Sequence, residues 1–154
     1  MEKFSIEFSR SEHLETLLSH RMRMWMEIYP DMKTNNEAHT KLTREWLKEK
    51  LDDGSMIAIL VRTHEGKIAG SGCILVQEDQ PRPDSSMIKR PYLLSMFVEE
   101  EYRNQGAATL IVQSAISWAR EHGYDRMTLH ASEAGRALYE KMGFRQTNEM
   151  RLFL

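Results

Sequence analysis

Hydrophobic and polar positions alternate with two different periods in the first third of the chain. Residues 4–8 alternate Phe and Ile with polar side chains, which is typical of a half-buried strand. Residues 14–25 repeat apolar side chains at helical spacing and predict an amphipathic helix. A second helix is predicted to follow, with Asn35 or Asn36 as its candidate cap and with an apolar side formed by Leu42, Trp46 and Leu51.

The middle of the chain predicts three consecutive strands. Two apolar runs at 56–61 and 68–76 are joined by a short turn, which indicates an antiparallel hairpin. The two glycines of "GSG" in the second run leave room for a close neighbour or mark a bulge. Residues 77–91 are polar and proline-rich, so they are predicted to form a loop. Residues 92–98, "YLLSMFV", have the pattern of a strand that is buried on both faces.

The last third of the chain predicts helices and strands in alternation. A helical apolar stripe ends near His122, and residues 126–130 follow as a strand. Ser132 is a candidate cap for a short helix, and residues 143–154 supply one or two closing strands. The predicted order is β-α-α-β-β-β-α-β-α-β-β, an α/β fold in a single domain over residues 1–154.

Composition and charge narrow the possible functions. The chain has 154 residues, of which 41% are hydrophobic and 29% charged, and this is the profile of a globular domain. A net charge of -2 gives no sign of a basic face, so no nucleic-acid partner is expected. No apolar run is long enough to cross a bilayer, and the lone cysteine, Cys73, suits a reducing compartment. We therefore expect a cytoplasmic protein without a membrane partner. The six histidines include no close pair at metal-ligand spacing, so no metal is expected.

Residues 103–109 connect the third apolar strand to a helix and carry few bulky side chains. The first N–H groups of a helix have no internal partner, and the macrodipole places roughly half a positive charge there. Gly106, Ala107 and Ala108 would let an anion approach the backbone, and Arg103 adds a charge with bidentate reach. These features favour a phosphate or pyrophosphate site. The alternative is a plain turn whose alanines pack on the sheet. No P-loop occurs, and "GSG" lacks the third glycine of a dinucleotide-binding motif.

Two motifs resemble those of the GCN5-related N-acetyltransferases (GNATs). "VEEEYRNQGAATL" resembles the family's acetyl-CoA signature, R/Q-x-x-G-x-G/A after a strand that ends in Val, with Arg103, Gly106 and Ala108 at its defined positions. "AGRALYEKMGF" resembles the later family motif, a helix ending in L-Y-x-K-x-G-F. The resemblance extends from about Tyr92 to Phe144, and upstream it rests on the order of elements. It implies a mixed, mostly antiparallel GNAT-type sheet with helices on both faces.

The resemblance implies an N-acetyltransferase, an acyltransferase that moves the acetyl group of its cosubstrate acetyl-CoA directly to an amine in a ternary complex. Tyr139 takes the place of a tyrosine that protonates the coenzyme sulfur in many relatives, as general acid. Alternatively its ring packs on the sheet and its hydroxyl is satisfied nearby. Ser132 stands where many relatives carry an Asn near the pantetheine, although a serine there can also cap the helix. The residues implied for coenzyme binding are Met96, Phe97, Val98, Arg103, Asn104, Gln105, Gly106, Ala107, Ala108, Thr109, Ser132 and Tyr139.

The sequence does not identify the general base. Many relatives place a Glu or Asp in the strand before the signature, but this chain has Ser95 and no acid in that strand. His130 ends its strand where the cleft should open, and an imidazole can accept a proton near neutral pH. Glu27 lies where the first helix passes into the connector and could hold the amine or act as base. Structural roles for both residues, and a water held by the backbone, remain alternatives.

Two hypotheses from different classes follow. The first is an N-acetyltransferase acting on a small-molecule amine or on a peptide or protein amine. The second is a non-catalytic acyl-CoA-binding or regulatory GNAT-like module, and the missing strand carboxylate is its best support. Members of the family often dimerise, so a homodimer that uses the final strand is possible. The sequence defines neither the acceptor nor the oligomeric state.

Overall fold

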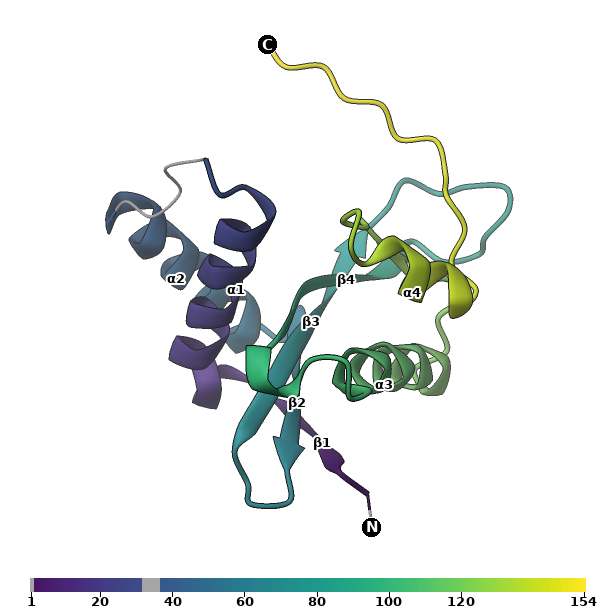
Figure 1. The fold of residues 1–154 in the computed structure, drawn as a ribbon. Coiled ribbons are helices and arrows are strands. Elements are labelled where there is room, and N and C mark those ends of the chain that lie inside the picture. Colours follow the sequence, from purple (N-terminus) through teal and green to yellow (C-terminus); the bar gives the residue numbers. More distant parts are fainter. Residues whose placement is uncertain (1, 32–36) are drawn as a thin grey trace.

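A five-stranded sheet with the order β1-β2-β3-β4-β5 forms the centre of the molecule (Figure 1). The computed structural model describes residues 2–31 and 37–154, so the candidate caps Asn35 and Asn36 lie outside the described residues. The first four strands pair antiparallel, whereas β4 and β5 are parallel. The expected mixed, mostly antiparallel sheet is therefore confirmed. The strands are β1 (Phe4–Ser9), β2 (Met56–Thr63), β3 (Ile68–Glu78), β4 (Lys89–Val98) and β5 (Thr128–Leu129).

Helices cover both faces of this sheet. One layer consists of α1 (Leu14–Ile28) and α2 (Glu37–Asp52), and the other consists of α3 (Ala107–Glu121) and the short α4 (Arg136–Lys141) (Figure 1). Two 3-10 turns, η1 (Ser11–His13) and η2 (Glu100–Tyr102), precede α1 and follow β4. Both helical layers agree with the expectation from the GNAT resemblance.

The central strand β2 explains why its sequence is apolar at nearly every position. Ile59 and Val61 pack toward α3, while Ala58 and Leu60 pack toward α1 and α2. All four side chains are fully buried, and burying one aliphatic side chain of this size contributes about 1.5–3 kcal/mol. The sheet is therefore held by a separate hydrophobic core on each face.

The apolar side of α2 agrees with the prediction at Trp46 and Leu51, which pack on the core, but not at Leu42. Leu42 is 65% exposed, so its predicted place on the apolar side is wrong. The residues of α2 that face the sheet begin one position after Leu42 and recur every four residues. The buried residues of α2 are Thr43, Leu47 and Leu51.

The closing strands predicted for residues 143–154 do not form within the described chain. Residues 145–154, here called the C-terminal segment, contain no strand and run outward from the sheet (Figure 1). β5 has only two paired residues, so it offers a short edge on which a further strand could add. As a result Met150, Leu152 and Phe153 are 80–94% exposed.

β4 contains an irregularity that matters for the site. Its register with β3 shifts between Ser71 and Cys73, and Ser95 on β4 has a left-handed φ of +58°. A Cβ on Gly70 would lie 2.7 Å from the carbonyl oxygen of Phe97, so β4 approaches closely there. Both features that the sequence suggested for the "GSG" glycines, a close neighbour and a bulge, are therefore present.

Candidate functional site

The two parallel strands β4 and β5 separate toward the end of β4. Their pairing is confined to Tyr92 with Thr128 and Leu93 with Leu129. From Leu94 onward, no described strand pairs with the β5-facing edge of β4. Apart from the Val98 carbonyl oxygen, which accepts from Arg103, its backbone polar groups there have no partner strand and can bind an extended ligand. The predicted pantetheine-binding residues, Met96, Phe97 and Val98, lie on this open part of β4.

The start of α3 is as bare as the sequence suggests. Gly106 is the residue before the helix, has a left-handed φ of +92°, and makes no side-chain cap. Asn104 is also left-handed, with φ +57°. In the described part of the chain, the N–H groups of Ala107, Ala108 and Thr109 have no hydrogen-bond acceptor. Together with the macrodipole they form a set of donors suited to an anion.

Arg103 does not point freely at this helix start. Its Nε donates to the carbonyl oxygen of Val98 at 2.9 Å, and its Nη2 lies 2.6 Å from Glu27 Oε1. The guanidinium carbon lies 5.5 Å from the ring centre of Phe97. Two predicted site residues, Arg103 and Glu27, are therefore brought together, but by binding each other. Gln105, the next predicted residue, donates to the carbonyl oxygen of Glu101 at 2.8 Å.

Tyr139 lies in the core beneath α3. Its side chain is 9% exposed and meets the Phe144 ring edge-on at 5.9 Å. Burial raises the pKa of the phenol, so the hydroxyl stays protonated at neutral pH. The described residues offer this hydroxyl no hydrogen-bond partner, and an unpaired buried hydroxyl is costly. The ring packs in the core, as the alternative structural role predicts. The hydroxyl, however, has no partner in the described chain and can bind a ligand.

Ser132 is found at the turn before α4. Its Oγ accepts a hydrogen bond from the Gly135 N–H at 3.2 Å, and its carbonyl oxygen accepts from the N–H groups of Gly135 and Arg136. Ser132 therefore closes the turn before α4, but it does not cap that helix, whose N-cap residue is Gly135 and which has no side-chain cap. Its own O–H remains able to donate to a ligand.

His130 belongs to a chain of three polar side chains that the sequence alone did not indicate. Its Nδ1 lies 2.5 Å from the Tyr92 hydroxyl, and its Nε2 lies 2.7 Å from Glu149 Oε2. With Nε2–H donated to the carboxylate, Nδ1 accepts from the phenol. Tyr92 and Glu149 were missed because they are 38 and 19 positions away from His130 in sequence.

Arg21 and Ser95 form a second pair that the sequence did not indicate. Ser95 is buried beside the β4 bulge, where many relatives carry an acid. Arg21 of α1 donates from Nη1 to Ser95 Oγ at 2.7 Å. A cation, rather than a carboxylate, therefore occupies this part of the face between α1 and β4.

A polar network around the buried His20 connects α1 to β3 and to the residue that follows β4. His20 Nδ1 lies 2.7 Å from Ser71 Oγ, and its Nε2 lies 3.1 Å from Glu99 Oε1. Glu99 also binds Arg23, with Nη2 at 2.5 Å. Burial lowers the pKa of His20, and the hydrogen bond from Arg23 lowers the pKa of Glu99. Nearby Cys73 is buried, and burial raises the pKa of its thiol to about 12, as expected of an inert cysteine.

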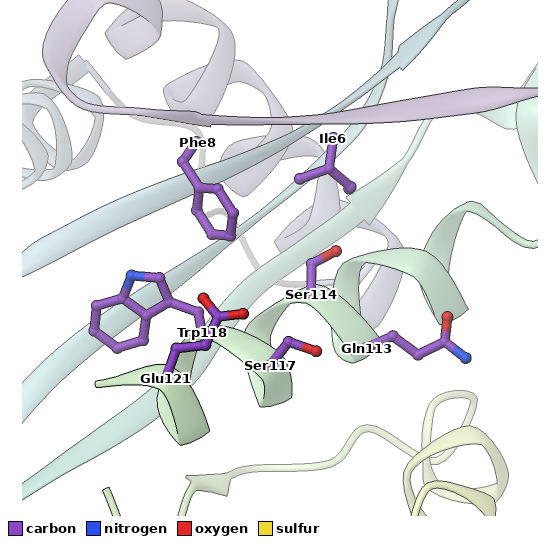
Figure 2. A pocket seen from close by; sticks show the side chains of 7 residues that line it. All are labelled: Ile6, Phe8, Gln113, Ser114, Ser117, Trp118 and Glu121. Atoms are coloured by element: carbon purple, nitrogen blue, oxygen red, sulfur yellow. The ribbon is translucent and has the colours of Figure 1, made fainter. Parts of the chain in front are cut away.

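A hollow of about 390 Å³ lies elsewhere, between β1 and α3 (Figure 2). Figure 2 shows Ile6 and Phe8 of β1 facing Ser114 and Trp118 of α3. None of the predicted site residues lines it, and Glu121 is its one titratable residue. We therefore assign neither coenzyme nor acceptor to this hollow.

The described residues show neither a metal-binding cluster nor a membrane-spanning helix. They contain no group of three or more His, Cys, Asp or Glu side chains placed to hold a metal ion. Within residues 2–31 and 37–154, no helix combines the length and apolar character needed to cross a membrane.

Comparison with known proteins identifies relatives across most of the chain. The sequence model of the acetyltransferase (GNAT) family matches residues 20–144. N-acetyltransferase 8 of Homo sapiens is 30% identical over 128 residues, which cover 81% of this chain and 52% of that protein. The uncharacterized N-acetyltransferase YdgE of Bacillus subtilis (strain 168) is 36% identical over 63 residues, 39% of this chain and 40% of that protein. The chain thus spans about half, or less, of the length of these curated relatives.

Solved structures share the fold over nearly the whole chain. A GCN5-related N-acetyltransferase from Ralstonia eutropha JMP134 has a TM-score of 0.90 and 27% identity, with 98% of each chain covered. The crystal structure of a predicted acetyltransferase with acetyl-CoA from Clostridium acetobutylicum has a TM-score of 0.86, with 98% of this chain and 96% of that chain covered. At 20% identity, this likeness shows only that the two proteins share a fold. With most of its length matched by the family model, this chain belongs to the acetyltransferase (GNAT) family.

Proposed function

We propose that the protein is an N-acetyltransferase that moves the acetyl group of acetyl-CoA directly to an amine. The observation that carries the proposal is the start of α3, where the N–H groups of residues 107–109 have no acceptor in the described chain. A pyrophosphate is the ligand group that suits such a helix start. The open edge of β4 at 94–98 supports the proposal, because a pantetheine arm carries amides that can pair with a strand.

Tyr139 is proposed as the general acid. Transfer breaks the bond between the acetyl carbon and sulfur, and the leaving thiolate needs a proton. The Tyr139 hydroxyl is buried, protonated and without a partner among the described residues, which suits a donor to that sulfur. Ser132, on the turn before α4, is proposed as a coenzyme contact through its free O–H.

The Tyr92–His130–Glu149 chain is proposed to take the proton from the amine. An amine with a pKa near 10.4 costs about 4.6 kcal/mol to neutralise at pH 7, so a proton acceptor is needed. In the chain, Glu149 orients His130, and His130 can accept the proton that the Tyr92 hydroxyl releases. Glu27 is a weaker candidate for the base, since its carboxylate already binds Arg103.

Thermal unfolding with and without acetyl-CoA tests the coenzyme site. Ligand at 100 times its Kd should add about 2.7 kcal/mol, or about 5–10 °C for a domain of this size. We expect Ala108→Glu to abolish the shift, because it adds a negative charge at the helix start. A substitution of Gly106 is less suitable, since φ +92° strains any other residue.

Gln113→Glu is the matched control for that experiment. It adds the same charge to an exposed position of α3, beyond the first turn, and should keep the shift. No shift in the wild type at millimolar acetyl-CoA, or an equal shift in both variants, would contradict the proposed site.

The second hypothesis, a non-catalytic acyl-CoA-binding module, keeps the coenzyme site but not the chemistry. Ser95, in place of an acid on β4, is the observation in its favour. Release of free CoA in the presence of an amine panel separates the two. A protein that binds acetyl-CoA and releases CoA with none of the amines would be a module.

We also propose a cytoplasmic homodimer. The exposed apolar residues Met150, Leu152 and Phe153 would be covered if residues 150–154 of one copy, beyond Glu149, added to the free edge of β5 in a second copy. Sedimentation velocity should give a dimer for the wild type and a monomer for the double variant Leu152→Asp/Phe153→Asp. A wild-type monomer at micromolar concentration would rule this dimer out.

A further inference from the structure

Arg21 is a half-buried cation without a counter-ion among the described residues. It lies on α1 and donates one hydrogen bond, from Nη1 to Ser95 Oγ at 2.7 Å. Its guanidinium carbon lies 5.4 Å from the centre of the Trp25 ring. No Asp or Glu oxygen of residues 2–31 or 37–154 comes within 4.0 Å of its nitrogens. A guanidinium has five N–H donors, so most of the donors of Arg21 have no acceptor in the described chain.

Three other arginines around β4 each bind a carboxylate. Arg23 of α1 binds Glu99, Arg90 of β4 binds Asp79, and Arg103 after β4 binds Glu27. Glu99 raises the pKa of Arg23, whereas burial lowers the pKa of Arg21. A cation removed from water without a counter-ion is unfavourable unless a ligand supplies the charge. Arg21 is thus the arginine in this group whose partner is missing from the described chain.

The surroundings of Arg21 belong to the acceptor side of the proposed active site. Ser95 precedes Met96, where the open edge of β4 is proposed to hold the pantetheine. Tyr92, the first member of the proposed proton-accepting chain, lies close enough to Arg21 for each to influence the other electrostatically. The free donors of Arg21 therefore lie beside the place where the acceptor amine must lose its proton.

We infer that Arg21 binds a carboxylate of the acceptor, so that the amine substrate is a small amino acid. The planar fork of a guanidinium matches a carboxylate with two parallel hydrogen bonds. A free amino acid carries its amine and carboxylate close together, and this fits a guanidinium held at Ser95 on the β4 bulge, on the same strand as Tyr92. This inference rests on the proposed acetyl transfer and deepens it by naming the class of acceptor.

Acetyl transfer to matched acids and amides tests the inference. The wild type is assayed for CoA release with free amino acids, with the primary amide of the best one, and with the corresponding decarboxylated amine. We expect kcat/KM for the acid to exceed that for the amide by about tenfold or more. Arg21→Gln should reduce this ratio to near one, and Arg21→Lys, which keeps the charge without the fork, should give an intermediate ratio.

Arg44→Gln is the control variant. Arg44 is a half-buried arginine of α2 that binds Glu15, and its removal should leave the acid-to-amide ratio unchanged. Thermal unfolding of each variant checks that the fold is retained. Calorimetric binding of the same acid and amide to the acetyl-CoA-loaded protein gives a second readout that does not depend on turnover.

The outcomes separate this inference from the proposed function. CoA release with simple amines, but with no preference for the acid, overturns the role of Arg21 and leaves the acetyltransferase standing. A preference that survives in Arg21→Gln overturns it as well. Preferential binding of the acid that depends on Arg21, but without CoA release, supports the carboxylate site and contradicts the transferase.

Discussion

At the scale of single residues, the hydrogen-bond partners of the Tyr139 hydroxyl distinguish a catalytic from a structural role for this residue. A tyrosine whose hydroxyl stabilised the fold would have an internal partner, and deleting that hydroxyl would leave the partner unpaired. Among the described residues Tyr139 has no such partner, while its ring packs against the core. The role of the ring and the role of the hydroxyl can therefore be tested separately.

Tyr139→Phe should lower kcat for CoA release by about 100-fold or more, because a positioned general acid contributes at least that factor. The same substitution should leave the melting temperature unchanged or raise it slightly, since it removes an unpaired buried polar group. The two measurements are CoA release and thermal unfolding of the same preparation. A loss of stability without a loss of rate would assign the hydroxyl to the fold.

At the scale of elements, β3 and β4 approach each other so closely that two positions of β3 are restricted to glycine for different reasons. A Cβ on Gly70 would meet the Phe97 carbonyl oxygen at 2.7 Å, and backbone cannot move aside easily. A Cβ on Gly72 would meet the Met96 sulfur at 3.0 Å, which can move aside, and Cγ2 of the buried Ile111 of α3 at 2.8 Å, which is a side-chain rather than a backbone contact.

Gly70→Ala should therefore destabilise the protein more than Gly72→Ala does. We expect a loss of about 1–3 kcal/mol for Gly70→Ala, the usual range for overpacking, and a smaller loss for Gly72→Ala. Urea unfolding of both variants measures the difference. Equal losses would mean that β4 adjusts its backbone as readily as its side chains.

Most elements between β1 and α4 could be predicted because their apolar periodicity is local. The closing strands could not, because a strand needs a partner edge and β5 offers only two residues. The helix start after β4 was also predictable, since its glycine and alanines stand next to each other in sequence.

The contacts that assemble the acceptor side are of another kind. Arg21 and Ser95 are 74 positions apart, and Tyr92 and His130 are 38 apart. No local spacing connects such residues, so only the packing of α1 on β4 and of β5 beside it brings them together. The same is true of Glu27 and Arg103, each of which was singled out without its partner.

At the scale of the whole molecule, the His20 network makes stability depend on pH. The folded state keeps His20 neutral because burial lowers its pKa, whereas an unfolded histidine titrates near pH 6.5. As the pH falls below 6.5, the unfolded state takes up a proton that the folded state does not, so the free energy of unfolding decreases. Glu99 also makes the free energy of unfolding decrease at low pH, because its pKa is lowered in the folded state. Its contribution is lost only as the pH falls below about 4.5.

Between pH 7 and pH 5 we therefore expect a decrease in unfolding free energy that His20 dominates. The slope attributable to one proton is at most about 1.4 kcal/mol per pH unit. Urea unfolding at several pH values measures this slope, and His20→Gln should flatten it in this range even if that variant is less stable throughout. An unchanged slope in His20→Gln would assign the effect to other groups.

The ion pair between Glu27 and Arg103 links the turn proposed to bind the coenzyme to the last turn of α1. A pyrophosphate arriving at the start of α3 would compete with Glu27 for the Arg103 guanidinium, and so loosen the end of the helix that also carries Arg21 and Trp25. Since coupling between two binding events is reciprocal, an acceptor bound first would weaken the hold on the coenzyme if it tightened that ion pair. The coenzyme and the acceptor would therefore weaken each other's binding by the same factor, whichever of them enters first.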